Sequence, residues 1–187
     1  MSPAGDFAMR WRVRLGYPVA LIYLVFAKPD EISIFAGGVI ALAGLWVRAS
    51  AAGHLRKHEQ LAMSGPYAHT RNPLYFGSVL IAAGFLVAGR FWIGAGWISA
   101  AVVAAYLGYF YSTVMKREEK ELRSQYGSAF EDYAARVPLF FPKLTGRSSA
   151  SGAFSWDQYK RNREYQAALG VLVGIAVLCL LIWVQSN

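Results

Sequence analysis

Five long apolar runs divide this sequence, and they restrict its fold more than any other feature. A helix needs about 20 mostly apolar residues to cross a bilayer. With 56% hydrophobic and only 16% charged residues, the chain is too apolar for an ordinary soluble domain. We therefore predict an all-α, polytopic membrane protein with about five transmembrane helices, forming one domain over residues 1–187. The runs are Leu15–Ala27, Ile32–Ala52, Leu74–Gly89, Phe91–Val114 and Ala167–Val184.

The distribution of lysine and arginine predicts the orientation of these helices, because cytoplasmic loops are enriched in both. With five spans, only Lys28 and Arg90 fall on the side opposite the other loop cations. We expect the protein in a bacterial inner membrane, with its amino terminus and both long polar segments in the cytoplasm and its carboxyl terminus outside. The first run also resembles a cleavable signal peptide, an alternative that leaves the remaining topology unchanged.

The formal net charge of +8 indicates an anionic partner. The basic residues lie between apolar runs and do not form a soluble basic face, so we expect anionic lipids and no nucleic acid. The only cysteine, Cys179, lies within an apolar run, and His54, His58 and His69 lack the spacing of zinc ligands. The sequence therefore predicts no metal site, and it leaves the oligomeric state open.

Residues Gly65–Gly77 form a basic, aromatic segment that two prolines interrupt. Prolines favour turn or extended backbone, which leaves amide and carbonyl groups available to a ligand. Arg71 adds a planar cation that can hold a carboxylate or phosphate through two hydrogen bonds. Two tyrosines add aromatic faces. The same pattern fits a turn that anchors the next helix at the lipid headgroups, so both interpretations stay open.

A second polar segment, Lys116–Glu121, directly follows the fourth apolar run and contains three carboxylates. Carboxylates near a membrane are costly to desolvate and are often functional where they face the interior of a helix bundle. Neighbouring side chains point in different directions, so at most one of Glu118 and Glu119 faces a site directly. The alternative is a solvated charged turn, which we favour for Lys120 and Glu121.

Between Lys116 and Pro138, apolar residues recur at three- and four-residue spacing, which predicts an amphipathic helix continuing from the fourth span. Pro138 and Pro142 are expected to end it. Residues 146–155 then read as a flexible linker and residues 156–166 as an interfacial stretch. The apolar face of the amphipathic helix consists of Leu122, Tyr126, Phe130, Tyr133 and Val137.

Together these motifs resemble the superfamily of isoprenylcysteine carboxyl methyltransferases and phospholipid methyltransferases, which are integral membrane enzymes. The family pattern has Gly-x-Tyr, Arg-His-Pro-x-Tyr-x-Gly, a helical hairpin, Glu-Glu, and an aromatic helix ending near Arg-Val-Pro. The likeness covers residues 53–142, the expected cofactor core, which precedes an interfacial segment and last transmembrane helix over 156–187. This chain carries the pattern as Gly65 with Tyr67, Arg71 to Gly77, Glu118 with Glu119, and Arg136-Val137-Pro138.

The resemblance implies that S-adenosylmethionine is the methyl donor, that S-adenosylhomocysteine is the product, and that the cofactor pocket lies at the cytoplasmic face. It implies a lipophilic acceptor from the bilayer: a phospholipid amine, an isoprenylated thiol or carboxylate, or a small lipophilic molecule. Arg71, Asn72 and Glu119 are the predicted catalytic residues. The predicted cofactor-binding residues are Gly65, Tyr67, Arg71, Asn72, Pro73, Tyr75, Glu118 and Glu119.

Asn72 departs from the family pattern, because the eukaryotic carboxyl methyltransferases have histidine at this position. A neutral amide donates and accepts hydrogen bonds but does not titrate near neutral pH. This difference favours cofactor binding over proton transfer, and it favours a bacterial-type member of the family. Asn162, Arg163 and Glu164 precede the last apolar run. They either cover the same site or only mark the membrane boundary.

Two other functions stay open. Membrane sterol reductases share a related helical core and use NADPH, although their chains are generally longer. A non-catalytic membrane protein would bind anionic lipid through its basic face, and this binding would weaken with salt. Such a protein would require neither the proline-interrupted segment nor a buried carboxylate.

Overall fold

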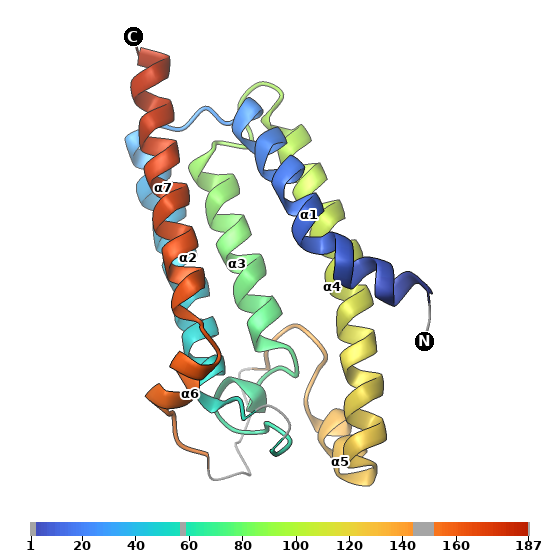
Figure 1. The fold of residues 1–187 in the computed structure, drawn as a ribbon. Helices are drawn as coiled ribbons and strands as arrows, with labels where there is room; N and C mark the ends of the chain where they lie inside the picture. Colours follow the sequence, from blue (N-terminus) through green and yellow to red (C-terminus); the bar gives the residue numbers. More distant parts are fainter. Residues whose placement is uncertain (1–2, 57–58, 144–151, 187) are drawn as a thin grey trace. The chain divides into compact units, whose positions relative to one another are not determined.

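The computed structural model describes residues 3–56, 59–143 and 152–186, and every regular element in these residues is a helix (Figure 1). The predicted all-α fold is therefore confirmed. The chain forms two compact units: unit 1 contains Met1–Leu42, Leu80–Arg117 and Val171–Asn187, and unit 2 contains Ala43–Val79 and Glu118–Gly170. The elements are α1 (Pro3–Phe26), α2 (Glu31–His54), the 3₁₀-helix η1 (Gly65–Ala68), α3 (Pro73–Ala88), α4 (Gly96–Tyr126), α5 (Ser128–Arg136), α6 (Trp156–Arg161) and α7 (Tyr165–Ser186).

Three of these helices, α2, α4 and α7, are long and apolar enough to cross a membrane. Residues Arg14–Phe26 of α1 and the whole of α3 are shorter apolar helices. Large apolar side chains such as Phe35 and Trp46 on α2 and Leu172 on α7 are exposed, which suits contact with lipid tails. These features support a membrane protein with three candidate spans.

The connection between α3 and α4 is longer than the sequence pattern predicts. The predicted apolar runs Leu74–Gly89 and Phe91–Val114 leave only Arg90 between them, but residues 89–95 form the connection and α4 begins at Gly96. The amide of Ile93 donates to the carbonyl of Arg90 (2.9 Å) and the amide of Gly96 donates to Ile93 (3.0 Å), which closes successive turns. Apolar composition does not distinguish a turn from a helix, so the start of α4 was predicted too early.

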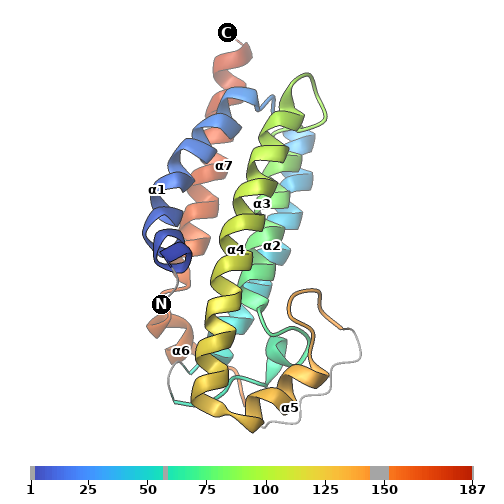
Figure 2. The same ribbon diagram turned by 90° about the vertical axis from the view of Figure 1, so that its right-hand side faces the viewer.

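Within unit 1, α2 and α3 run side by side and approach closely at glycines (Figures 1 and 2). A Cβ atom on Gly37 would clash with the carbonyl oxygen of Gly84 and would lie 2.7 Å from the backbone nitrogen of Ala88. Gly38, the next residue along α2, has nothing within 4 Å of the same hypothetical atom. The two glycines are neighbours in the same helix, but among the described residues a side chain at position 37 would meet α3 and one at position 38 would meet open space.

We expect Gly37→Ala to destabilise the protein by about 1–3 kcal/mol, because the added methyl group forces the two backbones apart. Gly38→Ala is the matched control, and it should be neutral or slightly stabilising because alanine favours helix. Unfolding of both variants in detergent, followed by circular dichroism, measures the difference. Equal stability of the two variants would contradict the close α2–α3 contact.

The core of unit 1 joins α1, α3 and α7. Tyr23 on α1 donates its hydroxyl hydrogen to the carbonyl of Phe85 on α3 at 2.5 Å. Leu178 on α7 is fully buried in a cluster with Tyr23 and Ala88. At the start of α2, the amide of Ser33 donates to Asp30 (2.7 Å) and Asp30 ion-pairs with Arg90 at 2.8 Å, so this helix end is both capped and neutralised.

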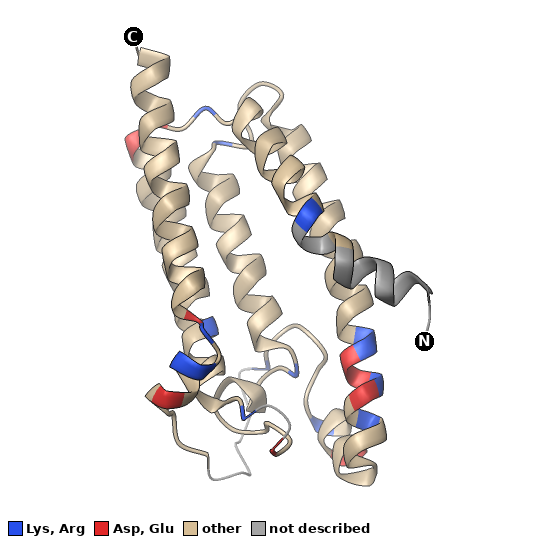
Figure 3. Cartoon of the chain, viewed as in Figure 1, with Lys and Arg blue, Asp and Glu red and all other residues tan. Residues whose placement is uncertain are grey.

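Unit 2 contains the last turns of α4, where the charged residues of this helix gather (Figure 3), followed by α5, which turns back from its end (Figure 2). Gly127, with a φ of 53°, separates the two helices. The amphipathic helix therefore continues from the apolar part of α4, as predicted, but breaks at this glycine. Its predicted apolar face is confirmed: Phe130, Tyr133 and Val137 are buried, with Leu122 and Tyr126 packed against them.

The segment before the last helix also follows the sequence pattern in part. The interfacial stretch forms the short helix α6, and α7 begins at Tyr165. The predicted linker at 146–155 lies largely outside the described residues.

Candidate functional site

Two proline-containing segments of unit 2 are joined along their backbones. The amide of Arg71 donates to the carbonyl of Pro138 at 3.0 Å, and the amide of Lys143 donates to the carbonyl of His69 at 2.9 Å. The hydroxyl of Thr70, which is almost fully buried, donates to the carbonyl of Phe140 at 2.8 Å. We call residues 69–72 with 138–143 the clasp. Pro138 and Pro142 were expected only to end the amphipathic helix, and this pairing of the two segments was not predicted.

Asn72 forms part of the clasp and is buried, with 8% of its surface exposed. Its side-chain nitrogen donates to the carbonyl of Leu139 at 3.0 Å, and its backbone nitrogen donates to the Thr70 hydroxyl at 3.3 Å. A histidine or amide side chain at this position can thus donate a hydrogen bond to the backbone carbonyl of Leu139. The geometry gives Asn72 a positioning role, and its catalytic role stays a prediction.

We expect Asn72→Asp to destabilise the protein by about 1–3 kcal/mol, because the buried carbonyl of Leu139 loses its donor and faces a carboxylate oxygen instead. Gln125→Glu is a matched change from amide to acid at an exposed position of α4. The control should change stability by less than about 0.5 kcal/mol. Denaturant unfolding of both variants checks the difference, and an unchanged midpoint for Asn72→Asp would argue against the clasp.

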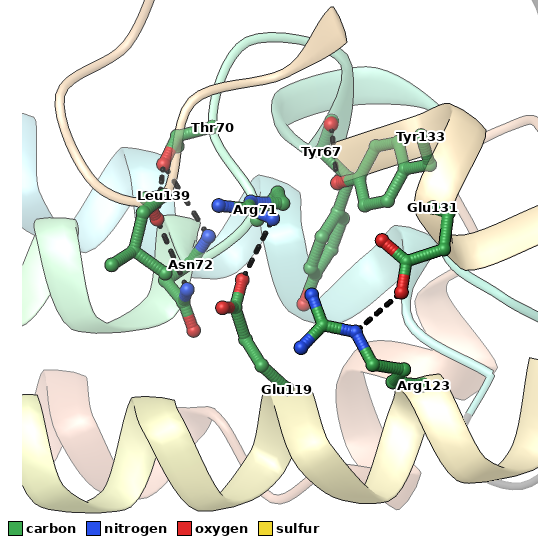
Figure 4. A network of polar contacts seen from close by, with 9 residues as sticks. All are labelled: Tyr67, Thr70, Arg71, Asn72, Glu119, Arg123, Glu131, Tyr133 and Leu139. Atoms are coloured by element: carbon green, nitrogen blue, oxygen red, sulfur yellow. Dashed lines mark hydrogen bonds and ion pairs between the residues drawn. The ribbon is translucent and has the colours of Figure 1, made fainter. Parts of the chain in front are cut away.

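The clasp presents Arg71 to Glu119, which points toward it from α4 (Figure 4). The Nη1 atom of Arg71 lies 2.9 Å from Oε1 of Glu119, and the two side chains are 14% and 18% exposed. Two residues that the sequence predicted as catalytic, 48 positions apart in the chain, are therefore brought together as a largely buried ion pair. Glu118 points differently and accepts a hydrogen bond from the hydroxyl of Tyr75 at 2.9 Å.

The pair is incompletely satisfied. Nε of Arg71 and Oε1 of Glu119 are buried, and neither makes a hydrogen bond among the described residues, although Oε1 forms the ion pair with Nη1. A buried polar atom without a partner costs about 1–3 kcal/mol. Atoms of this kind in a folded protein require an explanation, such as a ligand or a water that completes them.

Tyr67 lies in the same region and is 7% exposed. Its backbone carbonyl accepts a hydrogen bond from the hydroxyl of Tyr133 at 2.7 Å, which holds η1 against α5. Burial, followed by the nearby phenol of Tyr133 and the charges of Glu118 and Glu164, raises the pKa of the Tyr67 phenol well above its ordinary value. The phenol therefore stays protonated at physiological pH.

The remaining predicted residues shape the backbone. Gly65 has a φ of 57°, and a Cβ atom there would lie 2.7 Å from the ring of His54, so both conformation and space favour glycine. Pro73 is almost fully buried at the first position of α3, where its missing amide hydrogen costs nothing. These two residues position the segment and expose little of themselves to a ligand.

A second buried ion pair, between Arg48 and Glu164, was not predicted. Nε of Arg48 donates to Oε1 of Glu164 at 2.5 Å and Nη2 donates to Oε2 at 3.1 Å, so the pairing is bidentate. Nη1 of Arg48 also donates to the carbonyl of Leu74 (3.2 Å) and to the hydroxyl of Ser78. The sequence did contain a signal for this pair, because Arg48 is a single charge inside the second apolar run. A charge in such a run usually pairs with a group inside the helix bundle.

The two buried pairs of unit 2 therefore differ in a way that separates their roles. Every nitrogen of the Arg48 guanidinium donates a hydrogen bond, as expected for a structural tie between α2, α3 and the start of α7. The Arg71 guanidinium has one buried nitrogen, Nε, that makes no hydrogen bond to any residue that the structure describes. The unsatisfied pair is the better candidate for binding a ligand.

Asn162 and Glu164 were predicted either to cover the site or to mark the membrane boundary. The side-chain nitrogen of Asn162 donates to the carbonyls of Ala52 (2.9 Å) and Leu55 (3.0 Å), so it caps the end of α2. Glu164 pairs with Arg48 and not with Arg71. In the described part of the chain, no group of three or more His, Cys, Asp or Glu side chains could hold a metal ion.

Two metal-resistance proteins are similar to this chain in sequence. The nickel-cobalt-cadmium resistance protein NccN of Alcaligenes xylosoxydans xylosoxydans is 31% identical over 179 residues, which cover 86% of this chain and 79% of that protein. The cobalt-zinc-cadmium resistance protein CzcN of Cupriavidus metallidurans is 35% identical over 108 residues, or 57% of this chain and 47% of that protein. No solved structure matches the chain significantly.

A family match covers most of the region that contains the clasp and both buried ion pairs. Residues 31–137 match the DUF1295 family, described as proteins of unknown function. The match includes Arg48, Arg71 and Glu119 but ends before Glu164. Because it spans more than half of the sequence, this chain belongs to the DUF1295 family.

Proposed function

We propose that this protein is an integral membrane methyltransferase that uses S-adenosylmethionine to methylate a lipophilic acceptor. The observation that carries the proposal is the largely buried Arg71–Glu119 pair, whose Nε and Oε1 atoms make no hydrogen bond within the described part of the chain. The motifs that resemble the carboxyl and phospholipid methyltransferases supply both members of this pair. The clasp holds Arg71 from a rigid backbone, as a preorganised binding site requires.

The chemistry of these residues fits the proposed donor, which contains a carboxylate, an ammonium group and ribose hydroxyls. Arg71 would hold the carboxylate through its planar guanidinium. Glu119 would accept hydrogen bonds from the ammonium group or the ribose hydroxyls, and Glu118, oriented by Tyr75, would add a second acceptor. A ligand with both signs of charge would thus satisfy both orphaned atoms of the ion pair.

When bound, S-adenosylmethionine supplies an activated methyl group, so the protein mainly needs to hold donor and acceptor in line and exclude water. The clasp fixes the backbone of Arg71, and the burial of the Arg71 side chain limits the access of water to it. A carboxylate or thiolate acceptor needs no base, whereas an amine acceptor must lose a proton. The Tyr67 phenol, which stays protonated, does not supply that base.

The membrane arrangement that we propose has five spans, formed by α2, α4 and α7 together with the shorter apolar helices α1 and α3. The excess of Lys and Arg in the segments that contain the candidate site favours a cytoplasmic location in a bacterial inner membrane. The acceptor would enter from the bilayer.

Labelling tests the proposed activity and identifies the acceptor. Purified protein is incubated with native membranes and S-adenosylmethionine that carries a radioactive methyl group, and the extracted lipids are separated. Label in a lipophilic product is expected, and the chemistry of the product distinguishes N-, O- and S-methylation. Unlabelled lipids from a reaction with folded protein would count against the proposal.

The names of the two relatives favour a physiological context for this activity. One is named for resistance to nickel, cobalt and cadmium, and the other for resistance to cobalt, zinc and cadmium. We propose that the methylated product of this protein contributes to tolerance of such metals.

A strain lacking the gene, challenged with cadmium, tests this role. Wild-type protein and Glu131→Gln, a change at an exposed ion pair, should restore tolerance, while Glu119→Gln should not. Full rescue by Glu119→Gln would show that tolerance is independent of the candidate site.

A further inference from the structure

A polar hollow of about 340 Å³ lies beside the junction of α6 and α7 in unit 2. It is separate from the Arg71–Glu119 pair, and none of its lining residues belongs to the clasp. Two of the lining residues are arginines and one is a glutamate, so the hollow has a net positive charge. The lining residues are Glu59, Gln158, Arg161, Asn162 and Arg163.

Arg163 is held in an unusual backbone conformation at this hollow. Its φ is 54°, in the left-handed region that costs a residue other than glycine about 1 kcal/mol or more. The residues on both sides are anchored: Asn162 caps α2, and Glu164 pairs with Arg48. Arg163 between them is exposed and lines the hollow.

The second arginine, Arg161, forms only a weak, exposed ion pair. Nη1 of Arg161 lies 3.5 Å from Oε1 of Glu59, and the two side chains are 68% and 54% exposed. An exposed pair of this length contributes little to stability. Arg161 is thus available to a stronger anion, and a phosphate is the anion that two arginine forks bind best.

The surroundings of the hollow match the headgroup region of a bilayer. The candidate span α7 begins at Tyr165, two residues after Arg163. Three large aromatic side chains close in sequence to the lining residues are exposed: Phe154, Trp156 and Tyr165. Aromatic residues concentrate at the interface between membrane and water, where lipid phosphates also lie. The volume is at the lower end of the range for small-ligand sites.

We propose that this hollow binds the phosphate of an acidic phospholipid, with Arg163 and Arg161 as the anion-binding residues. The bound lipid would fix the short helix α6 and the start of α7 at the membrane surface. This proposal is independent of methyl transfer, because it uses neither the clasp nor the Arg71–Glu119 pair.

The variant Arg163→Gly gives a clean test, because glycine adopts a φ of 54° without strain and only the side chain is lost. The full chain in a zwitterionic detergent is titrated with short-chain phosphatidylglycerol, with phosphatidylcholine, and with inorganic phosphate. Binding of phosphatidylglycerol by the wild type should weaken about tenfold or more in Arg163→Gly, as expected for the loss of a charge-assisted hydrogen bond. Lys120→Gln, which removes an exposed charge from α4, should bind like the wild type.

The outcomes separate this site from its alternatives. Equal binding of phosphatidylglycerol and phosphatidylcholine, or an equal loss in Lys120→Gln and Arg163→Gly, would overturn the proposal in favour of diffuse lipid contact. Inorganic phosphate binding as tightly as the lipid would assign the hollow to a soluble phosphate instead. Loss of S-adenosylhomocysteine binding in Arg163→Gly would assign the hollow to the donor site. Arg163→Asn, whose residue type also tolerates left-handed backbone, should reproduce the effect of the glycine variant.

Discussion

Glu119→Gln is expected to weaken the binding of S-adenosylmethionine by about 10- to 100-fold, with a corresponding loss of methyl transfer at low donor concentration. The substitution keeps the size of the side chain but removes the charge that both Arg71 and the donor would share. Because Arg71 is only 14% exposed, it would retain a buried charge without its partner. Calorimetric titration of the purified protein measures the affinity.

Two further variants separate binding from folding. Glu131→Gln breaks an ion pair with Arg123 whose side chains are both 54% exposed, and it should leave donor affinity unchanged. The double variant Arg71→Ala/Glu119→Ala removes both buried charges, so it should be more stable than Glu119→Gln yet still fail to bind the donor. If this double variant bound the donor like the wild type, the pair would have only a structural role.

Arg48→Ala is expected to have the largest effect on stability, about 3–5 kcal/mol, because it leaves the Glu164 carboxylate buried without a partner. Glu164 is 7% exposed, and Arg48 is also the donor to the carbonyl of Leu74 and to Ser78. The loss removes a tie between three helices of unit 2. Chemical denaturation in detergent, monitored by tryptophan fluorescence, gives the change in unfolding free energy.

The double substitution Arg48→Met/Glu164→Leu provides the control. Apolar residues of similar size often replace a buried ion pair at little cost, so most of the lost stability should return. Such a protein should still bind the methyl donor, because the Arg71–Glu119 pair is unchanged. A stable double variant without donor binding would show that Arg48 and Glu164 belong to the binding site.

Much of the fold could be predicted because bilayer thickness and helix periodicity leave few alternatives. The apolar runs of α2 and α7 have the length of a span, and the spacing of Phe130, Tyr133 and Val137 identified the face that α5 buries. The start of α4 was missed because Phe91 and Trp92 are apolar residues in a turn. The break at Gly127 was missed because a single glycine also occurs within helices.

The sequence identified several residues of the candidate site but not how the fold arranges them. The motifs selected Arg71 and Glu119, and their ion pair follows from the fold. The clasp depends on backbone hydrogen bonds between segments nearly 70 residues apart, such as Arg71 to Pro138, and backbone atoms carry no sequence signal. The charge of Arg48 within an apolar run indicated a buried partner, but nothing in the sequence identified that partner as Glu164. The sequence placed Glu164 only at the membrane boundary or over the candidate site.

The most direct test of the central claim is calorimetric titration of the purified wild-type protein, folded in detergent with lipid, with S-adenosylhomocysteine. We predict saturable binding that S-adenosylmethionine displaces, that NADPH does not, and that Glu119→Gln reduces while Glu131→Gln preserves it. Absence of binding to the folded protein, or displacement by NADPH, would contradict a methyl-donor site at Arg71 and Glu119.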